Sequence, residues 1–141
     1  MIIVDTNVVS ELTRDRPDGR VISWFDAQPH TTLYLTSITA AELLFGIQGL
    51  PDGRRKAVLG SAVGRLLETG FAGRILPFDF AASISYSGLA ATRSRMGRPI
   101  QIADCMIAAI ALSAGDGVVA TRNTTDFERI GLDLINPWDG Q

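Results

Sequence analysis

Short apolar runs alternate with helix-like segments along nearly the whole chain, and few folds accommodate this alternation. Each run is short enough and apolar enough to be a buried strand. The runs are residues 2–4, 33–37, 74–78, 117–121 and 132–136. Strands that alternate with helices need crossover connections, so we predict an α/β fold with three α/β/α layers and a mostly parallel sheet of about five strands.

The segments between the runs carry apolar residues at helical spacing, and glycine or proline ends several of them. Asn7 and Asp79 are predicted to cap the helices that follow them. The predicted helices are 7–13, 18–28, 38–50, 52–69, 80–96 and a last one that begins at Pro99 or Ile100 and ends at Gly115. A chain of 141 residues has the size of one compact domain, so we predict a single domain over residues 1–141.

Several chemistries are excluded by residues that the chain lacks. His30 is the only histidine, which rules out a histidine-rich zinc site or a two-histidine ribonuclease, and neither GxxxxGK[S/T] nor GxGxxG occurs. The single Cys105 excludes an internal disulfide and is predicted to be a small core residue. Asp and Glu total 15, so we expect any catalysis to use carboxylates.

No apolar run reaches the roughly 20 residues that a membrane span needs, and the N-terminus lacks the features of a signal peptide. We therefore expect a cytoplasmic protein without a membrane partner. The formal net charge of −2 argues against a nonspecific coat on nucleic acid. Arginine forks still match phosphate oxygens, so a local phosphate contact remains open.

Asp104 is the only charged residue in the apolar stretch 101–115. The helix dipole favours an anion in the first turn by only ~0.3–1 kcal/mol. Desolvation of a carboxylate costs more, roughly several kcal/mol. Asp104 must therefore reach water, pair with Arg93 or Arg98, or hold a cation.

Asp5 and Glu42 each have a structural and a functional interpretation. Asp5 ends the first predicted strand, where it can cap the next helix or line a site at the carboxyl ends of the strands. Glu42 can complete a capping box with Thr39, unless Ser37 caps the helix one turn earlier. Together with Asp104, these acids would repel one another unless a hard cation intervened, which favours Mg²⁺, with Mn²⁺ as a substitute, and phosphodiester hydrolysis.

The same residues resemble a known family. Asp5-Thr6-Asn7 after a strand, Glu42 in ITAAEL, Asp104 in ADCMIAA and Thr121 to Thr124 before Phe127 are similar to the PIN-domain ribonucleases. Within that family, the chain resembles the VapC-type toxins and their FitB-like subgroup, which ends in Asn-Pro-Trp, here residues 136–138. The resemblance covers nearly the whole chain.

The resemblance implies Mg²⁺-dependent endoribonuclease activity in the toxin of a toxin–antitoxin pair. It implies that Asp5, Glu42 and Asp104 are catalytic and bind the metal. Asn123 stands where close kin carry Asp, and Asp126 either compensates or caps a short helix. Thr6 and Thr121 would support the site. The implied partners are a second copy of the chain, a cognate antitoxin, an RNA substrate, and operator DNA reached only through the antitoxin.

The hypothesis is therefore hydrolysis of an RNA phosphodiester by metal-activated water, with Arg98 or Arg122 holding a neighbouring phosphate. One alternative is a non-catalytic interaction or regulatory protein that acts with a DNA-binding antitoxin, in which Asp104 pairs with an arginine. The other alternative is a phosphatase with an aspartyl nucleophile. The phosphatase ranks lower because Asn7 stands where such enzymes want a second Asp, and the only lysine, Lys56, lies in a charged segment.

Overall fold

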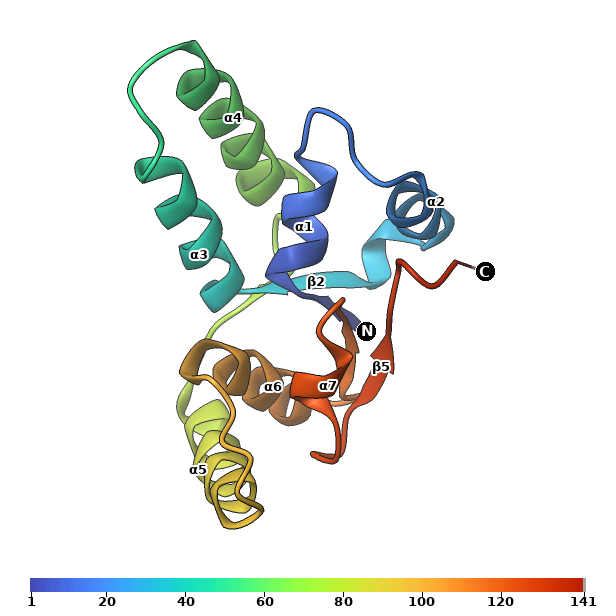
Figure 1. The fold of residues 1–141 in the computed structure, drawn as a ribbon, viewed down its shortest axis with the longest axis vertical. Helices are drawn as coiled ribbons and strands as arrows, with labels where there is room; N and C mark the ends of the chain where they lie inside the picture. Colours follow the sequence, from blue (N-terminus) through green and yellow to red (C-terminus); the bar gives the residue numbers. More distant parts are fainter. Residues whose placement is uncertain (141) are drawn as a thin grey trace.

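A five-stranded, entirely parallel sheet forms the centre of the computed structural model, which describes residues 1–140 (Figure 1). Gln141, the last residue of the predicted domain, lies outside them. The strand order is β3-β2-β1-β4-β5, which confirms the predicted α/β fold. Strand β1, Ile2–Val4, has the predicted bounds, and the other four strands are shorter than predicted: β2 Leu33–Thr36, β3 Ile75–Leu76, β4 Val118–Ala120 and β5 Asp133–Ile135.

Helices cover both faces of the sheet and complete the three predicted layers (Figure 1). One face carries α1 Thr6–Leu12, α2 Gly19–Ala27, α3 Ser37–Gln48 and α4 Arg54–Arg65. The other carries α5 Phe80–Arg95, α6 Ile102–Ala114 and α7 Thr124–Phe127. A 3₁₀ turn, His30–Thr32, precedes β2, and a π-helical turn, Leu66–Gly70, follows α4. Over residues 1–140, no helix combines the length and the apolar character that crossing a bilayer requires.

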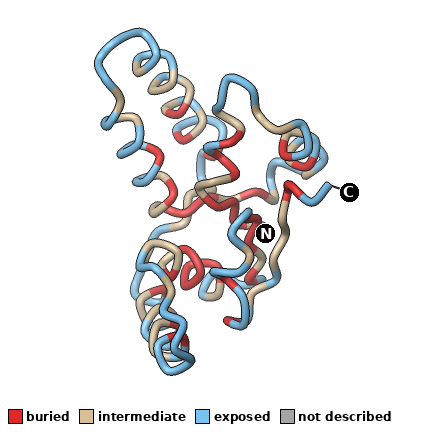
Figure 2. Tube along the Cα trace, viewed as in Figure 1, coloured by how far each residue is buried: buried red, intermediate tan, exposed pale blue. Residues whose placement is uncertain are grey.

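Two hydrophobic cores lie on opposite sides of the sheet because successive side chains of a strand point to opposite faces. In β1, Ile3 packs with α5 and α6, whereas Val4 packs with α1 to α4. Cys105 lies in the core on the side of α5 and α6, where it is 1% exposed, which confirms that it is a small core residue. The buried segments in Figure 2 follow the strands and the inner faces of the helices.

The caps of two helices differ from the prediction, and the cap of a third agrees with it. Asp5 caps α1, while Asn7 lies inside that helix. The hydroxyl of Thr36 caps α3, so the predictions of Thr39 or Ser37 as its cap are wrong. In both helices the capping side chain belongs to the last extended residue before the helix. Strand β1 ends at Val4 as predicted, whereas β2 ends one residue earlier than predicted. Asp79 caps α5 as predicted, and its Oδ1 accepts the Ala82 N–H at 2.9 Å.

Arg93 is a buried cation that joins α5 to the segment before α6 and to α7. It is only 4% exposed. Its Nε donates to the Arg98 carbonyl and its Nη1 to the Asp126 carbonyl, both at 2.7 Å. Among residues 1–140, neither Arg93 nor Arg98 forms an ion pair with Asp104, so that structural interpretation of Asp104 is wrong.

Replacement of Arg93 by methionine should destabilise the fold. The change leaves two carbonyls without a charged donor, and we expect a loss of about 2–3 kcal/mol in the free energy of unfolding, measured by urea denaturation. Arg95→Met, at an exposed position of the same helix, is the matched control and should change stability by less than about 0.5 kcal/mol. Equal losses in the two variants would contradict the role of Arg93.

Candidate active site

Asp5 lies where the central strand β1 ends, and three donors hold its carboxylate. Oδ1 accepts the Thr6 N–H at 2.7 Å, while Oδ2 accepts the Thr121 hydroxyl at 2.7 Å and the Asn7 amide at 3.1 Å. Asp5 is 3% exposed, and burial raises its pKa above the ordinary value, although these hydrogen bonds oppose the shift. The side chain therefore caps α1 and also faces the site, so both interpretations of Asp5 hold.

Glu42 lies within α3, one turn past its start, and is exposed to solvent. The Thr6 hydroxyl donates to Glu42 Oε1 at 2.8 Å and also lies 3.1 Å from the Thr39 hydroxyl. Thr39 in turn lies 3.3 Å from the hydroxyl of Thr36, at the end of β2. A row of threonine hydroxyls thus connects the ends of two neighbouring strands to the Glu42 carboxylate.

Asp104 is in the first turn of α6 and is half-buried. Among residues 1–140, it has no hydrogen-bond or ion-pair partner for its carboxylate. Desolvation raises the pKa of Asp104 to about 6, with further contributions from the negative charges of Asp5, Asp126 and Glu42. The helix dipole does not offset these effects. Asp104 is therefore a carboxylate held beside other carboxylates without compensation from the protein.

The segment after β4 brings the remaining predicted residues to the site. The Thr121 hydroxyl donates to Asp5 and accepts the N–H of Asn123 at 3.0 Å. Asn123 directly precedes α7, and Asp126 lies within that short helix, so the alternative that Asp126 caps it is wrong. The Arg122 N–H donates to Asn7 Oδ1 at 3.2 Å, which ties this segment to α1.

These side chains line one cavity of about 600 Å³ at the carboxyl edge of the sheet. Most predicted site residues contribute to it, but Arg98 does not, since it is exposed on the segment before α6. Thr121 is fully buried beneath Asp5 and supports the site from behind. The lining residues are Asp5, Thr6, Asn7, Ser10, Glu11, Arg14, Glu42, Gln101, Asp104, Arg122, Asn123, Asp126 and Trp138.

One face of α1 was not predicted to belong to the site. Asn7, Ser10 and Glu11 lie on α1, and Arg14 follows just after its end; their helical spacing in the sequence was the signal that could have revealed them. Glu11 is 7% exposed and accepts the Asp18 N–H at 2.8 Å and the Arg14 guanidinium at 3.2 Å. The Asp18 N–H lowers the pKa of Glu11, so this acid fixes the connection between α1 and α2.

The donors at this edge have the chemistry that a hard cation needs. They are carboxylate and amide oxygens, and neither histidine nor cysteine lines the cavity. The side chains of Asp5, Asp126 and Glu42 are close enough to Asp104 to raise its pKa. Within the described residues, however, no three His, Cys, Asp or Glu side chains converge as metal ligands must. The donor types therefore suit a hard cation such as Mg²⁺, but in this structure the acids do not converge on one point.

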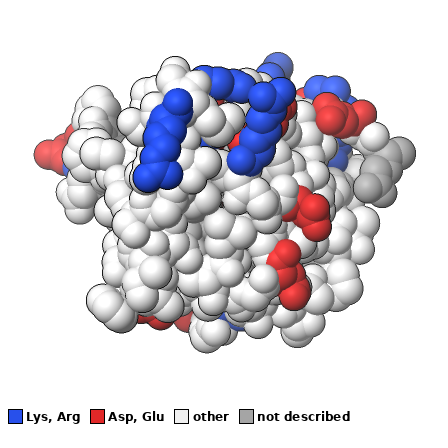
Figure 3. Space-filling view, turned by 90° about the horizontal axis from the view of Figure 1, so that it is seen from below, with Lys and Arg blue, Asp and Glu red and all other residues white. Residues whose placement is uncertain are grey.

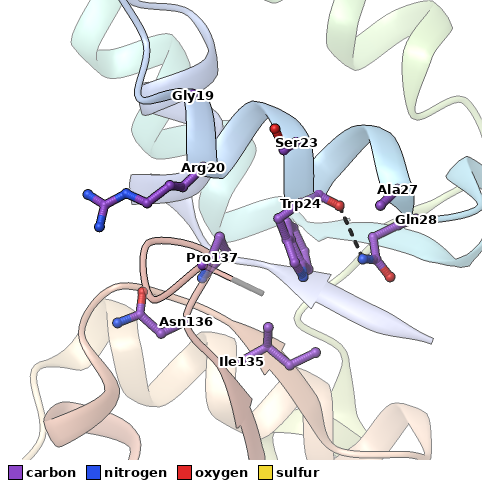
Figure 4. A pocket seen from close by; sticks show the side chains of 10 residues that line it. Gly19, Arg20, Ser23, Trp24, Ala27, Gln28, Ile135, Asn136 and Pro137 are labelled. Atoms are coloured by element: carbon purple, nitrogen blue, oxygen red, sulfur yellow. Dashed lines mark hydrogen bonds between the residues drawn. The ribbon is translucent and has the colours of Figure 1, made fainter.

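A second cavity of about 400 Å³ lies between α2 and the C-terminal segment. Figure 4 shows Trp24 projecting from α2 toward Ile135 and Pro137, with Arg20 directed away from the cavity. Arg20 pairs with Asp18 at 2.7 Å, and this bond lowers the pKa of Asp18 to about 2. Pro137 lines this cavity and Trp138 lines the acidic one, so the C-terminal segment separates the two.

The chain is similar to known proteins over nearly its whole length. VapC ribonuclease Y4jK of Sinorhizobium fredii is 48% identical, and the alignment covers 99% of each chain. Toxin FitB of Neisseria gonorrhoeae is 39% identical, with 98% of this chain and 99% of that protein covered. The solved structure of FitAB bound to the IR36 DNA fragment superposes with a TM-score of 0.91 at 38% identity, covering 98% of this chain and 96% of that chain.

Residues 2–132 match the PIN domain family. The match spans strands β1 to β4 and every predicted acid of the site. Its extent and the similarity to a VapC ribonuclease and a FitB toxin confirm the resemblance that the sequence motifs carry. The chain belongs to the PIN-domain family.

Proposed function

We propose that this chain is a Mg²⁺-dependent endoribonuclease and the toxin of a toxin–antitoxin pair. The observation that carries the proposal is Asp104, a half-buried carboxylate beside Asp5, Glu42 and Asp126 that has no partner among residues 1–140. A bound divalent cation would remove the repulsion that raises its pKa. The similarity to VapC ribonuclease Y4jK and toxin FitB supports RNA as the substrate and toxicity as the role.

In this proposal, Asp5, Glu42 and Asp104 would hold the cation, and Asn123 and Asp126 would be further oxygen donors of the same cavity. Bound Mg²⁺, or Mn²⁺ in its place, would polarise the phosphate and favour ionisation of water. The chain's own residues position the reactants. Thr121 and Asn7 fix the orientation of Asp5, and Thr6 fixes that of Glu42.

The remaining polar groups of the cavity would position the RNA. Arg122 lines the cavity, and its guanidinium can hold a phosphate next to the one that is cleaved. Arg98 lies outside the cavity, so Arg122 is the better candidate of the two arginines. With no histidine in the site, proton transfer would fall to carboxylates and water.

A cognate antitoxin is part of the proposal. The chain resembles one chain of the FitAB complex, whose structure was solved with a DNA fragment bound. We therefore propose that this chain reaches operator DNA through its antitoxin. A cavity beside α1 and α4 is lined by arginines and apolar side chains: Arg14, Arg54, Arg55, Val58, Leu59 and others. Such a surface would accept an acidic, amphipathic segment of the antitoxin.

We also propose that the chain forms a homodimer through apolar side chains of α3 and α5. Phe45 on α3 and Phe80 on α5 are each 80% exposed, and Leu44 and Ile84 are exposed beside them in sequence. Figure 1 places α3 and α5 along the same side of the molecule. The surface seen from below, at the α5 end, is largely uncharged, with Lys and Arg gathered along one edge (Figure 3). Apolar surface of this kind favours a protein partner.

Asp104→Asn tests the enzymatic function. The variant keeps the shape of the side chain but removes a charge that the cation needs, so RNA cleavage should fall by roughly 100-fold or more. Metal-stripped protein is mixed with total RNA, Mg²⁺ or Mn²⁺ is added back, and the products are separated on a denaturing gel.

Asp52→Asn, at an exposed position far from the cavity, is the matched control and should cleave at the wild-type rate. Cleavage by Asp104→Asn at the wild-type rate would contradict the assignment of Asp104. Absence of cleavage by the wild type, with antitoxin excluded and no Mg²⁺ binding by calorimetry, would favour the non-catalytic interaction protein.

The double variant Phe45→Ser, Phe80→Ser tests the homodimer. Removal of two exposed rings should convert a dimer into a monomer, which light scattering after gel filtration would report as a halved mass. Val58→Ser, an exposed apolar residue on α4 that is 60% exposed, is the control and should leave the mass unchanged. A wild-type protein that is monomeric at high concentration would overturn this part of the proposal.

A further inference from the structure

Arg122 lines a cavity that also contains carboxylates, but its guanidinium does not pair with them. The cavity contains Asp5, Glu42, Asp104 and Asp126, yet Arg122 forms no ion pair within residues 1–140. Its guanidinium instead lies over the ring of Trp138, 5.2 Å from the ring centroid. This distance is that of a cation–π contact.

Both sides of this contact are held in place. Trp138 is 7% exposed, and its backbone N–H donates to the Asn136 side chain at 3.1 Å. Pro137 between them is buried. The backbone of Arg122 is tied to Asn7 on α1. The Asn-Pro-Trp segment therefore forms a fixed support on which the guanidinium rests.

The choice of partner decides what the guanidinium can still bind. An ion pair with Asp104 or Glu42 would use the N–H donors of Arg122 and would also occupy carboxylate oxygens that a cation needs. An aromatic face attracts the cation through its ring quadrupole and leaves the N–H donors at the edge of the guanidinium available. Trp138 thus leaves the N–H donors of Arg122 available to an anion and the carboxylates of the same cavity available to a cation.

We propose that Trp138 is a positioning residue that holds Arg122 away from the carboxylates and presents it to a phosphate of the RNA backbone. The inference rests on the proposed ribonuclease function. It gives a role to the Asn136–Trp138 segment, which supports the guanidinium of Arg122. Arg122 is the residue that would bind the phosphate, and Trp138 acts through it.

RNA binding by variants of Trp138 and Arg122 tests this role. Each variant is made in an Asp104→Asn background so that the RNA stays intact. A fluorescein-labelled single-stranded RNA oligonucleotide is titrated, and anisotropy gives the Kd at several salt concentrations. We expect Trp138→Leu to weaken binding on the order of fivefold, as Arg122→Gln does. Both should reduce the slope of log Kd against log salt by about 0.7, the loss of one phosphate contact on a single strand.

Two further variants separate positioning from packing. Trp138→Phe keeps an aromatic face and should bind RNA nearly as the reference does, and Trp138→Leu combined with Arg122→Gln should be no weaker than Arg122→Gln alone. Trp24→Leu is the matched control, because Trp24 belongs to the same core, is 8% exposed and lines the other cavity (Figure 4). It should lose stability while it keeps the RNA affinity and the salt slope.

The role of Trp138 would be overturned if Trp138→Leu bound RNA as tightly as the reference. It would also be overturned if the loss of RNA affinity in the double variant equalled the product of the losses in the two single variants. A second measurement separates this failure from failure of the proposed function. In ¹⁵N-resolved NMR spectra, the Arg122 Nε–Hε proton should be shifted upfield by the indole ring and should return toward its ordinary position in Trp138→Leu. An unshifted proton in the wild type would contradict the contact between Arg122 and Trp138. A shifted proton, combined with no RNA binding by either the Asp104→Asn reference or the wild type, would contradict the proposed ribonuclease function and therefore this role as well.

Discussion

Repulsion between carboxylates at one edge of the sheet is the constraint on which the rest of the site depends. Asp5 is buried among three donors, and Glu42 is held by a threonine hydroxyl. Asp104 receives neither kind of support, and its pKa rises to about 6. A fold selected for stability alone would place an apolar or amide side chain there, because burial of an uncompensated charge is costly. In the proposed function, the cation compensates for this cost.

The parallel sheet is what makes this concentration of charge feasible. Strands β2, β1 and β4 are neighbours and all run in one direction, so their carboxyl ends meet at one edge. Residues far apart in the sequence thereby become hydrogen-bonded, such as Asp5 and Thr121 across 116 positions. The same edge receives the N-terminal parts of α3 and α6, which carry Glu42 one turn past the start of α3 and Asp104 in the first turn of α6. Rigid elements therefore position the acids, and hydroxyl and amide groups orient two of them.

The sequence predicted the elements of this arrangement better than the contacts between them. The five apolar runs predicted the strands, and the lone Asp104 in an apolar helix predicted an acid at the site. Contacts between distant segments have no local signal, which explains why the carbonyl partners of Arg93 and the contact of Arg122 with Trp138 were not predicted. The sequence left Arg98 and Arg122 open as alternative phosphate contacts, because spacing along the chain does not show which arginine faces the cavity; of the two, Arg122 lines it.

The most direct test of this account is the pH dependence of stability in the wild type and in Asp104→Asn, with and without Mg²⁺. A carboxyl whose pKa is about 6 when folded and 3.8 ordinarily binds its proton more tightly in the folded state, so its contribution to stability falls as the pH rises through that interval. Without metal, we expect Asp104→Asn to gain about 1–2 kcal/mol over the wild type between about pH 4 and pH 7, after allowance for solvent screening. Mg²⁺ should then stabilise the wild type and leave the variant nearly unchanged. A stability difference that is independent of both pH and Mg²⁺ would contradict the account.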